Sequence, residues 1–132
     1  LCLLVPEKFG IRSVAELLRE GRVSLPLIAL SGSDTIRRVF FEELDKRRVE
    51  WLPSLELGSL DLVARYAAQG FGIGLGLKLA RMKLPKGVEE LVLEDFPPVV
   101  CSVFHVARPA PLVRMFIEES LELAKELFAA QG

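Results

Sequence analysis

Apolar runs of strand length alternate along this chain with segments whose apolar residues recur at helical spacing. The run Pro26–Leu30 is apolar throughout, which is typical of a strand buried on both faces of a sheet. Helical spacing follows directly, with apolar side chains at Ile36, Val39, Phe40 and Leu44. A strand, a helix and a further strand in this order predict β-α-β units. We therefore expect an α/β fold with a mostly parallel sheet and helices on both faces.

The same patterns continue along the rest of the chain. Strands are expected at Leu1–Val5, Pro26–Leu30, Val49–Leu57, Phe71–Leu77, Val88–Leu93 and Val99–Val106. Helices are expected between Ser13 and Gly21, over residues 35–47 and 60–69, and from Pro111 to Ala129. Ser13 and Glu16 form a capping-box pattern at the first of these helices. Val88–Leu93 alternates apolar and acidic residues, so it is expected to be an edge or half-exposed strand.

Composition excludes several classes of protein. The formal net charge is −1 and basic residues alternate with acidic ones, which argues against a nucleic-acid-binding face. Cys2 and Cys101 both lie in apolar runs, and His105 is the only histidine, so neither a disulfide framework nor a metal site is expected. No apolar run reaches the roughly 18 residues that cross a bilayer. With no visible signal peptide, we expect a cytoplasmic protein that does not contact membranes.

Two loops are candidates for ligand binding, because ligands in open α/β sheets bind beyond the carboxyl ends of the strands. Their candidate residues are Ser31, Gly32, Ser33, Thr35, Gly58 and Ser59. Each loop opens a helix, and a helix start binds an anion through unpaired N–H groups without needing Lys or Arg. The structural alternative is that Ser33 or Asp34, and Ser59, only cap their helices. The charge of Asp34 would also compete with an anion.

The glycine-rich segment Gly70–Gly76 does not predict a dinucleotide site. A phosphate-binding glycine loop follows a strand and opens a helix, whereas these glycines follow a helix and lie within the next strand. They are interpreted as points where the backbone closely approaches a ligand or a neighbouring element, or as simple strand packing. Phe71 and Gly72 are therefore included among the candidate ligand-binding residues. No catalytic set has a recognisable spacing, so neither an enzyme nor a cofactor is expected.

The sequence resembles the effector-binding domain of LysR-type transcriptional regulators. The most specific likeness is Leu60–Gly74, which reads LDLVARYAAQGFGIG. Leu25–Leu30 followed by Arg38-Val39-Phe40 resembles the second subdomain of that family, and so does the ending with Pro109-Ala110-Pro111 and Phe116-Ile117. The likeness covers nearly the whole chain. The chain departs from the family at Gly76-Leu77-Lys78, where the family commonly has a proline.

The resemblance implies two α/β subdomains, similar to periplasmic solute-binding proteins of type 2, with a small and often anionic effector bound between them. Residues 1–7 would be a crossover strand from a missing first subdomain, and residues 8–100 the second subdomain. Residues 101–132 would be a return strand and a C-terminal helix that pack on the first subdomain. DNA would be bound only through a missing N-terminal helix-turn-helix domain.

The resemblance and the apolar faces together predict a homo-oligomer. Phe41 widens the apolar side of helix 35–47. Apolar residues cover about half the circumference of the C-terminal helix, against the ~100° stripe of a helix with one buried face. Oligomerisation through these two helices would cover both surfaces.

Two other functions remain open at this stage. The first is a solute-binding protein of a transporter, which would need an export signal. The second is an enzyme on the same two-lobed fold, since a fold does not determine a function. The upstream sequence would distinguish a regulator, with its helix-turn-helix, from an exported protein.

Overall fold

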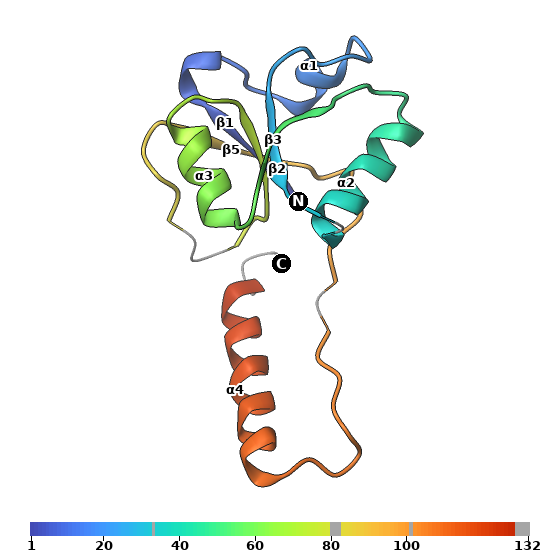
Figure 1. Ribbon diagram of the computed structural model, residues 1–132, viewed down its shortest axis with the longest axis vertical. Coiled ribbons are helices and arrows are strands. Elements are labelled where there is room, and N and C mark those ends of the chain that lie inside the picture. Colours follow the sequence, from blue (N-terminus) through green and yellow to red (C-terminus); the bar gives the residue numbers. More distant parts are fainter. Residues whose placement is uncertain (33, 80–82, 101, 129–132) are drawn as a thin grey trace. The chain divides into compact units, whose positions relative to one another are not determined.

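The computed structural model describes residues 1–32, 34–79, 83–100 and 102–128 (Figure 1). The chain forms two compact units. The first contains Leu1–Lys78 and Lys83–Val99, and the second contains Leu79–Met82 and Val100–Gly132. Each unit is described by itself.

The first unit contains all the strands that the structure describes, and three helices besides a short 3-10 turn. In chain order they are β1 (Cys2–Pro6), η1 (Glu7–Phe9), α1 (Val14–Leu18), β2 (Leu27–Leu30), α2 (Thr35–Lys46), β3 (Pro53–Leu57), α3 (Leu60–Ala68), β4 (Ile73–Gly76) and β5 (Val88–Val92). The second unit contains α4 (Pro111–Phe128). The predicted α/β class is confirmed.

The strands form one open mixed sheet of five strands in the order β3-β2-β4-β1-β5. β2 is parallel to β3 and to β4, whereas β1 is antiparallel to β4 and to β5. β5 therefore runs in the same direction as β2, β3 and β4, and β1 alone is reversed. The expected parallel arrangement holds among β3, β2 and β4, and the insertion of β1 makes the sheet mixed.

The two longer helices of this unit lie on opposite faces of the sheet (Figure 1). The connection through α2 leads from β2 to β3, its neighbour on one side. The connection through α3 then leads from β3 back across β2 to β4, the neighbour of β2 on the other side. Right-handed crossovers in opposite directions place their helices on opposite faces. Gly74 lets α3 approach β4, because a Cβ atom there would lie 2.8 Å from Cγ1 of Val63.

Aromatic side chains pack beneath α2, on the face of the sheet opposite α3. The ring of Phe40 contacts Trp51 edge to face at 6.0 Å and stacks with Phe96 at 5.7 Å between centroids. The indole Nε1–H of Trp51 donates to the carbonyl of Leu25 at 2.8 Å. Cys2 of β1 is completely buried, as predicted for a small core residue. Cys101 lies outside the described residues.

Some predicted elements are corrected by the structure. The strand predicted at Val99–Val106 is wrong: the described residues of that range have no strand structure, and Phe104 is 92% exposed. A strand needs the hydrogen bonds of a neighbouring strand, and none lies beside this range in the described part of the chain. The strand predicted at Val49–Leu57 begins only at Pro53, after the left-handed turn at Arg48 (φ 56°).

Candidate functional site

The candidate site lies where the parallel strands β2, β3 and β4 have their carboxyl ends, which we call the carboxyl edge of the sheet. Leu30 and Leu57 are register partners at the ends of β2 and β3. The N–H of Ser31 donates to the carbonyl of Leu57 at 2.9 Å, which holds the loop after β2 against the end of β3. From here the two connections diverge to α2 and α3 on opposite faces. Adjacent strands whose connections diverge in this way are where ligands bind in open α/β sheets.

The start of α2 is capped by Asp34. Its Oδ1 accepts a hydrogen bond from the N–H of Ile36 at 2.8 Å. Thr35 is the first residue of the helix and is exposed. Gly32 has a left-handed φ of 81°, and a Cβ atom there would meet no other atom within 4 Å. Ser33 lies outside the described residues. The capping interpretation is therefore confirmed for Asp34.

The start of α3 is capped by Ser59, whose hydroxyl accepts a hydrogen bond from the N–H of Leu62 at 3.3 Å. Gly58 and Ser59 are both exposed. A Cβ atom at Gly58 would also meet nothing within 4 Å, so neither glycine of the two loops is needed for packing. The structure thus brings Ser31, Gly32, Thr35, Gly58 and Ser59 to one edge, where they face open space.

Arg37 was not anticipated from the sequence. Its guanidinium donates to the carbonyl of Leu30, at the end of β2, over 3.3 Å and forms an ion pair with Glu56 of β3. It also lies over the ring of Phe41, 5.4 Å from the centroid. The only sequence signal for this placement is a basic residue in the first turn of a helix, which is too common to be specific. Arg37 links α2 to both strands and brings a cation, offset by Glu56, close to the site.

A hollow of about 420 Å³ lies on the outer side of α2. Its walls include Gly32, Asp34 and Arg37 from the first part of the helix and its loop, and Phe41 and Glu42 further along. Gly58 and Ser59 do not contribute to it. The first unit by itself therefore offers the two helix starts as an exposed surface, without enclosing a ligand between them.

Phe71 and Gly72 lie at the amino ends of the parallel strands, which we call the amino edge of the sheet. They precede β4, and the N–H of Ile73 donates to the carbonyl of Pro26, just before β2, at 2.8 Å. A Cβ atom at Gly72 would come within 2.5 Å of that same carbonyl oxygen. Phe71 is 58% exposed and lies against Tyr66, with 5.4 Å between ring centroids. The structure does not bring these residues together with the other candidates, and Gly72 allows a close approach to a neighbouring loop.

The chain enters and leaves the sheet at the carboxyl edge. Cys2 pairs with Gly76 on one side and with Val92 on the other, and these two residues end β4 and β5. The N–H of Leu93 donates to the carbonyl of Leu1 at 3.0 Å. The beginning of β1 and the segment after β5 therefore lie at the same edge as the two helix starts.

Reactive side chains are scarce where the structure describes the chain. No group of three or more His, Cys, Asp or Glu residues could hold a metal ion there. Burial and the neighbouring Glu90 raise the pKa of the Cys2 thiol to about 12, so the thiol remains protonated. His105 is exposed. No described helix has the length and apolar character needed to cross a membrane.

Comparison with known proteins does not add to these observations. No protein-family model matches the chain, and no significant similarity was found among curated proteins or among solved structures. The resemblance to LysR-type regulators therefore rests on the sequence motifs alone.

Proposed function

We propose that this chain is the effector-sensing part of a cytoplasmic LysR-type transcriptional regulator and that it binds a small anionic metabolite at the carboxyl edge of its sheet. One observation carries the proposal. The starts of α2 and α3 diverge from adjacent parallel strands at the edge where the chain also enters and leaves the sheet. A ligand held there would contact both helix starts and any subdomain joined through β1.

The chemistry of the two helix starts favours an anion. Each start carries about half an elementary positive charge and several N–H groups without a partner in the helix. Asp34 and Ser59 each accept a hydrogen bond from one such group, which leaves others for a ligand. Because Asp34 is negative and Ser59 is neutral, we expect the start of α3 to contribute more to the affinity for an anion. The acidic Asp61 in its first turn is paired with Arg65 at 2.9 Å.

The path of the chain supports a two-lobed arrangement. β1 is an interior strand that begins at the carboxyl edge, and β5 ends at the same edge. Two connections at one edge would act as a hinge between this unit and a first subdomain, as in periplasmic-binding-protein-like domains of type 2. In this proposal the sheet is the second subdomain, and the effector binds between the two.

The second unit supplies an apolar surface for that first subdomain. Exposed apolar side chains lie along α4 and the segment before it: Val103, Phe104, Val106, Leu112, Met115, Phe116, Leu121 and Leu123. Monomeric proteins rarely expose apolar patches beyond a few hundred Å². We propose that residues 101–132 complete the first subdomain.

The proposed partners follow from the same role. The full protein would be a homo-oligomer, in which the helix bearing Phe41 and the C-terminal helix contribute to contacts between copies. Phe41 is only partly buried, against Phe40 at 5.4 Å between centroids. DNA would be bound by a separate helix-turn-helix domain, and its affinity would change when the effector binds.

Calorimetry on the complete sensor region tests the proposal, after thermal-shift screening of small carboxylate and phosphate metabolites. Gly58→Asp adds a negative charge beside the start of α3 without a steric conflict, because a Cβ atom there meets nothing. We expect it to weaken binding of an anionic effector about tenfold. Gly58→Asn, of the same size and without the charge, should change binding far less. Equal affinities for the wild type and Gly58→Asp would show that the site is misplaced.

A further inference from the structure

A hollow of about 580 Å³ lies away from the candidate site, beside the edge strand β5. Its walls come from residues 12–15, 18 and 19 around α1, from Arg47 and Val49 after α2, and from residues 90–96. The volume lies within the range of small-molecule sites, about 300–1,000 Å³.

The floor of this hollow is apolar. Val14, Leu18, Val49 and Leu91 line it, and all four pack against the core but remain only partly buried. Leu93 and Phe96, which are 3% and 7% exposed, continue the apolar surface beneath them. The hollow leaves one side of these side chains uncovered, so an apolar ligand group that entered it would be removed from water.

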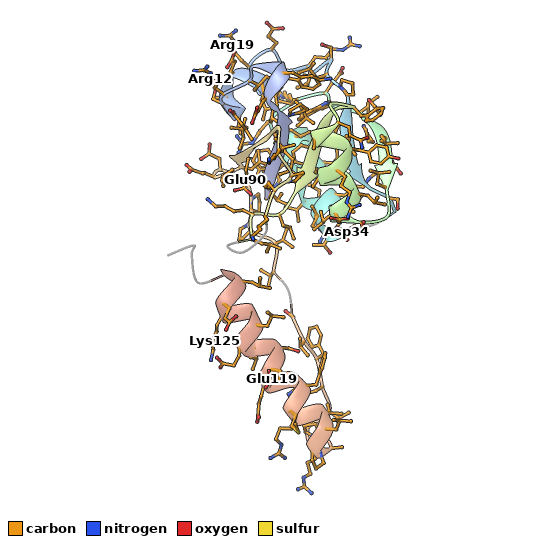
Figure 2. All side chains as sticks on the ribbon, turned by 90° about the vertical axis from the view of Figure 1, so that its left-hand side faces the viewer. Arg12, Arg19, Asp34, Glu90, Glu119 and Lys125 are labelled. Atoms are coloured by element: carbon orange, nitrogen blue, oxygen red, sulfur yellow. The ribbon has the colours of Figure 1, made fainter. Side chains whose placement is uncertain are left out.

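Two arginines on the wall have no partner among the residues that the structure describes. Arg12 precedes α1 and Arg19 follows it, and both side chains lie on the same part of the first unit (Figure 2). Among the described residues, neither arginine forms a hydrogen bond, ion pair or ring contact. A guanidinium group presents donors in a fork that matches a carboxylate. Two unpaired cations beside an apolar floor indicate a ligand that has both an anionic group and an apolar body.

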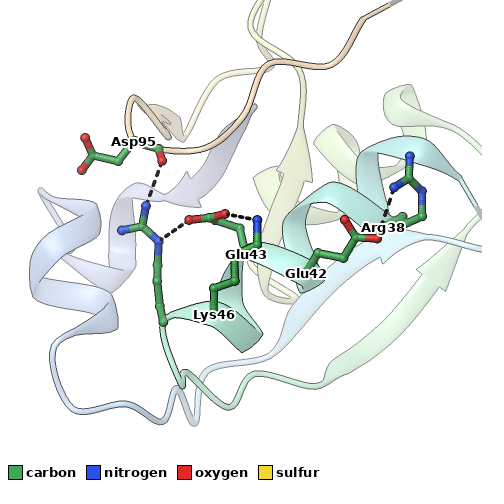
Figure 3. A network of polar contacts seen from close by, with 6 residues as sticks. Arg38, Glu42, Glu43, Lys46 and Asp95 are labelled. Atoms are coloured by element: carbon green, nitrogen blue, oxygen red, sulfur yellow. Dashed lines mark hydrogen bonds and ion pairs between the residues drawn. The ribbon is translucent and has the colours of Figure 1, made fainter.

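Arg47 forms a third, rigidly held cation at the hollow. Its Nε–H donates to Glu43 at 3.1 Å, and its terminal N–H donates to the carbonyl of Asp95 at 2.8 Å. The guanidinium also stacks over Phe96 at 4.7 Å from the ring centroid. Glu43 in turn pairs with Lys46 at 3.2 Å on the last turns of α2 (Figure 3). This network fixes the wall of the hollow opposite α1.

Acidic residues also line the hollow, but they do not neutralise Arg12 or Arg19. Glu90 pairs in register with Leu4 and lies beside the Cys2 thiol, on the face of the sheet that carries α3. Glu94 and Asp95 are exposed in the turn after β5, where the backbone carbonyl of Asp95 binds Arg47. Neither forms an ion pair with the two arginines beside α1.

We propose that this hollow is a second ligand site, which binds a small organic carboxylate through Arg12 and Arg19 and buries its apolar body on Val14, Leu18 and Leu91. The site is built from the first unit alone, so it does not depend on the function proposed above. Its ligand differs from one bound at the helix starts, because the helix starts offer N–H groups and hydroxyls without an apolar floor.

Binding of octanoate to the 132-residue chain, followed by NMR chemical-shift changes, tests this site. Octanoate should shift the amide signals of residues 12–19 and 90–96. Acetate lacks the apolar body and octan-1-ol lacks the charge, so both should bind at least about tenfold more weakly. Equal binding of octanoate and octan-1-ol, no binding of octanoate, or shifts confined to residues 31–35 and 58–59 would each overturn the proposal.

Substitution of the arginines gives an independent measurement. The double variant Arg12→Gln with Arg19→Gln should weaken octanoate binding about tenfold or more, because it removes both charged donors. Arg65→Gln is the matched control, since it removes an exposed arginine from α3 on the other face. Unchanged binding by the double variant would overturn the assignment of the two arginines. If the double variant fails to fold, the comparison of octanoate with octan-1-ol on the wild-type chain still decides.

Discussion

Replacing Gly72 by alanine should destabilise the first unit strongly, although it adds only a methyl group. The new Cβ atom would lie 2.5 Å from the carbonyl oxygen of Pro26, whereas ordinary contact begins at 3.4 Å, so the atoms would have to separate by 0.9 Å. The same oxygen accepts the 2.8 Å hydrogen bond from Ile73 that starts the pairing of β4 with β2. Relief of the clash therefore lengthens that hydrogen bond.

The magnitude follows from these two effects. Overpacking of a well-packed site costs about 1–3 kcal/mol, and a weakened backbone hydrogen bond costs about 0.5–1.5 kcal/mol. We expect the free energy of unfolding to fall by about 2–4 kcal/mol, against a total of about 5–15 kcal/mol for a native domain. Urea unfolding monitored by Trp51 fluorescence measures this loss, because Trp51 is the only tryptophan and is 3% exposed in the first unit.

Gly58→Ala is the matched control for this prediction. A Cβ atom at Gly58 meets nothing, and its backbone lies outside the left-handed region. The substitution should leave stability unchanged or raise it by up to about 1 kcal/mol by restricting the unfolded chain. A loss below about 0.5 kcal/mol for Gly72→Ala would refute the close approach to Pro26.

Further predictions concern the cap of α3, the stability of the fold at acidic pH and the buried thiol of Cys2. Ser59→Ala should lower the free energy of unfolding by about 1 kcal/mol, as measured in urea, and Ser59→Gly should lower it by less. Hydrogen bonds and charges from Lys46 and Arg47 lower the pKa of Glu43 below its ordinary 4.5, so Glu43 stabilises the fold above pH 4.5. That contribution is lost as the pH falls through the folded-state pKa. Urea midpoints between about pH 3 and 6 should depend less on pH in Glu43→Gln. In a Cys101→Ser background the remaining Cys2 thiol, with its pKa near 12, should resist alkylation at pH 8 until urea unfolds the chain; rapid alkylation of the native protein would contradict its burial.

Local interactions made much of the fold predictable. The continuous apolar run at residues 27–30 became a strand buried on both faces, and helical spacing located α2 and α3 to within a few residues. The caps at Ser13 and Ser59 follow from the same short-range chemistry, since a side chain at a helix start reaches an N–H group three residues later. These features depend on residues close together in sequence, so the sequence alone indicates them.

Tertiary structure decided where distant residues meet. The glycine-rich segment was compatible with a close approach of the backbone to a ligand or to a neighbouring element, and only the tertiary structure places Pro26 beside Gly72. Arg37 reaches the end of β2 and Glu56 because α2 and β3 both pack next to that strand. The insertion of β1 between β4 and β5 likewise depends on long-range pairing.

The sequence by itself thus determined the α/β class, the main helices and their caps, because each arises from interactions within a few residues. It did not determine which edge of the sheet each loop occupies. Phe71 and Ser59 lie within one short stretch of sequence, yet α3 carries the chain from the carboxyl edge to the amino edge between them. The strand expected at Val99–Val106 was wrong for a related reason: a strand is completed by hydrogen bonds to a neighbour, which apolar residues alone do not supply.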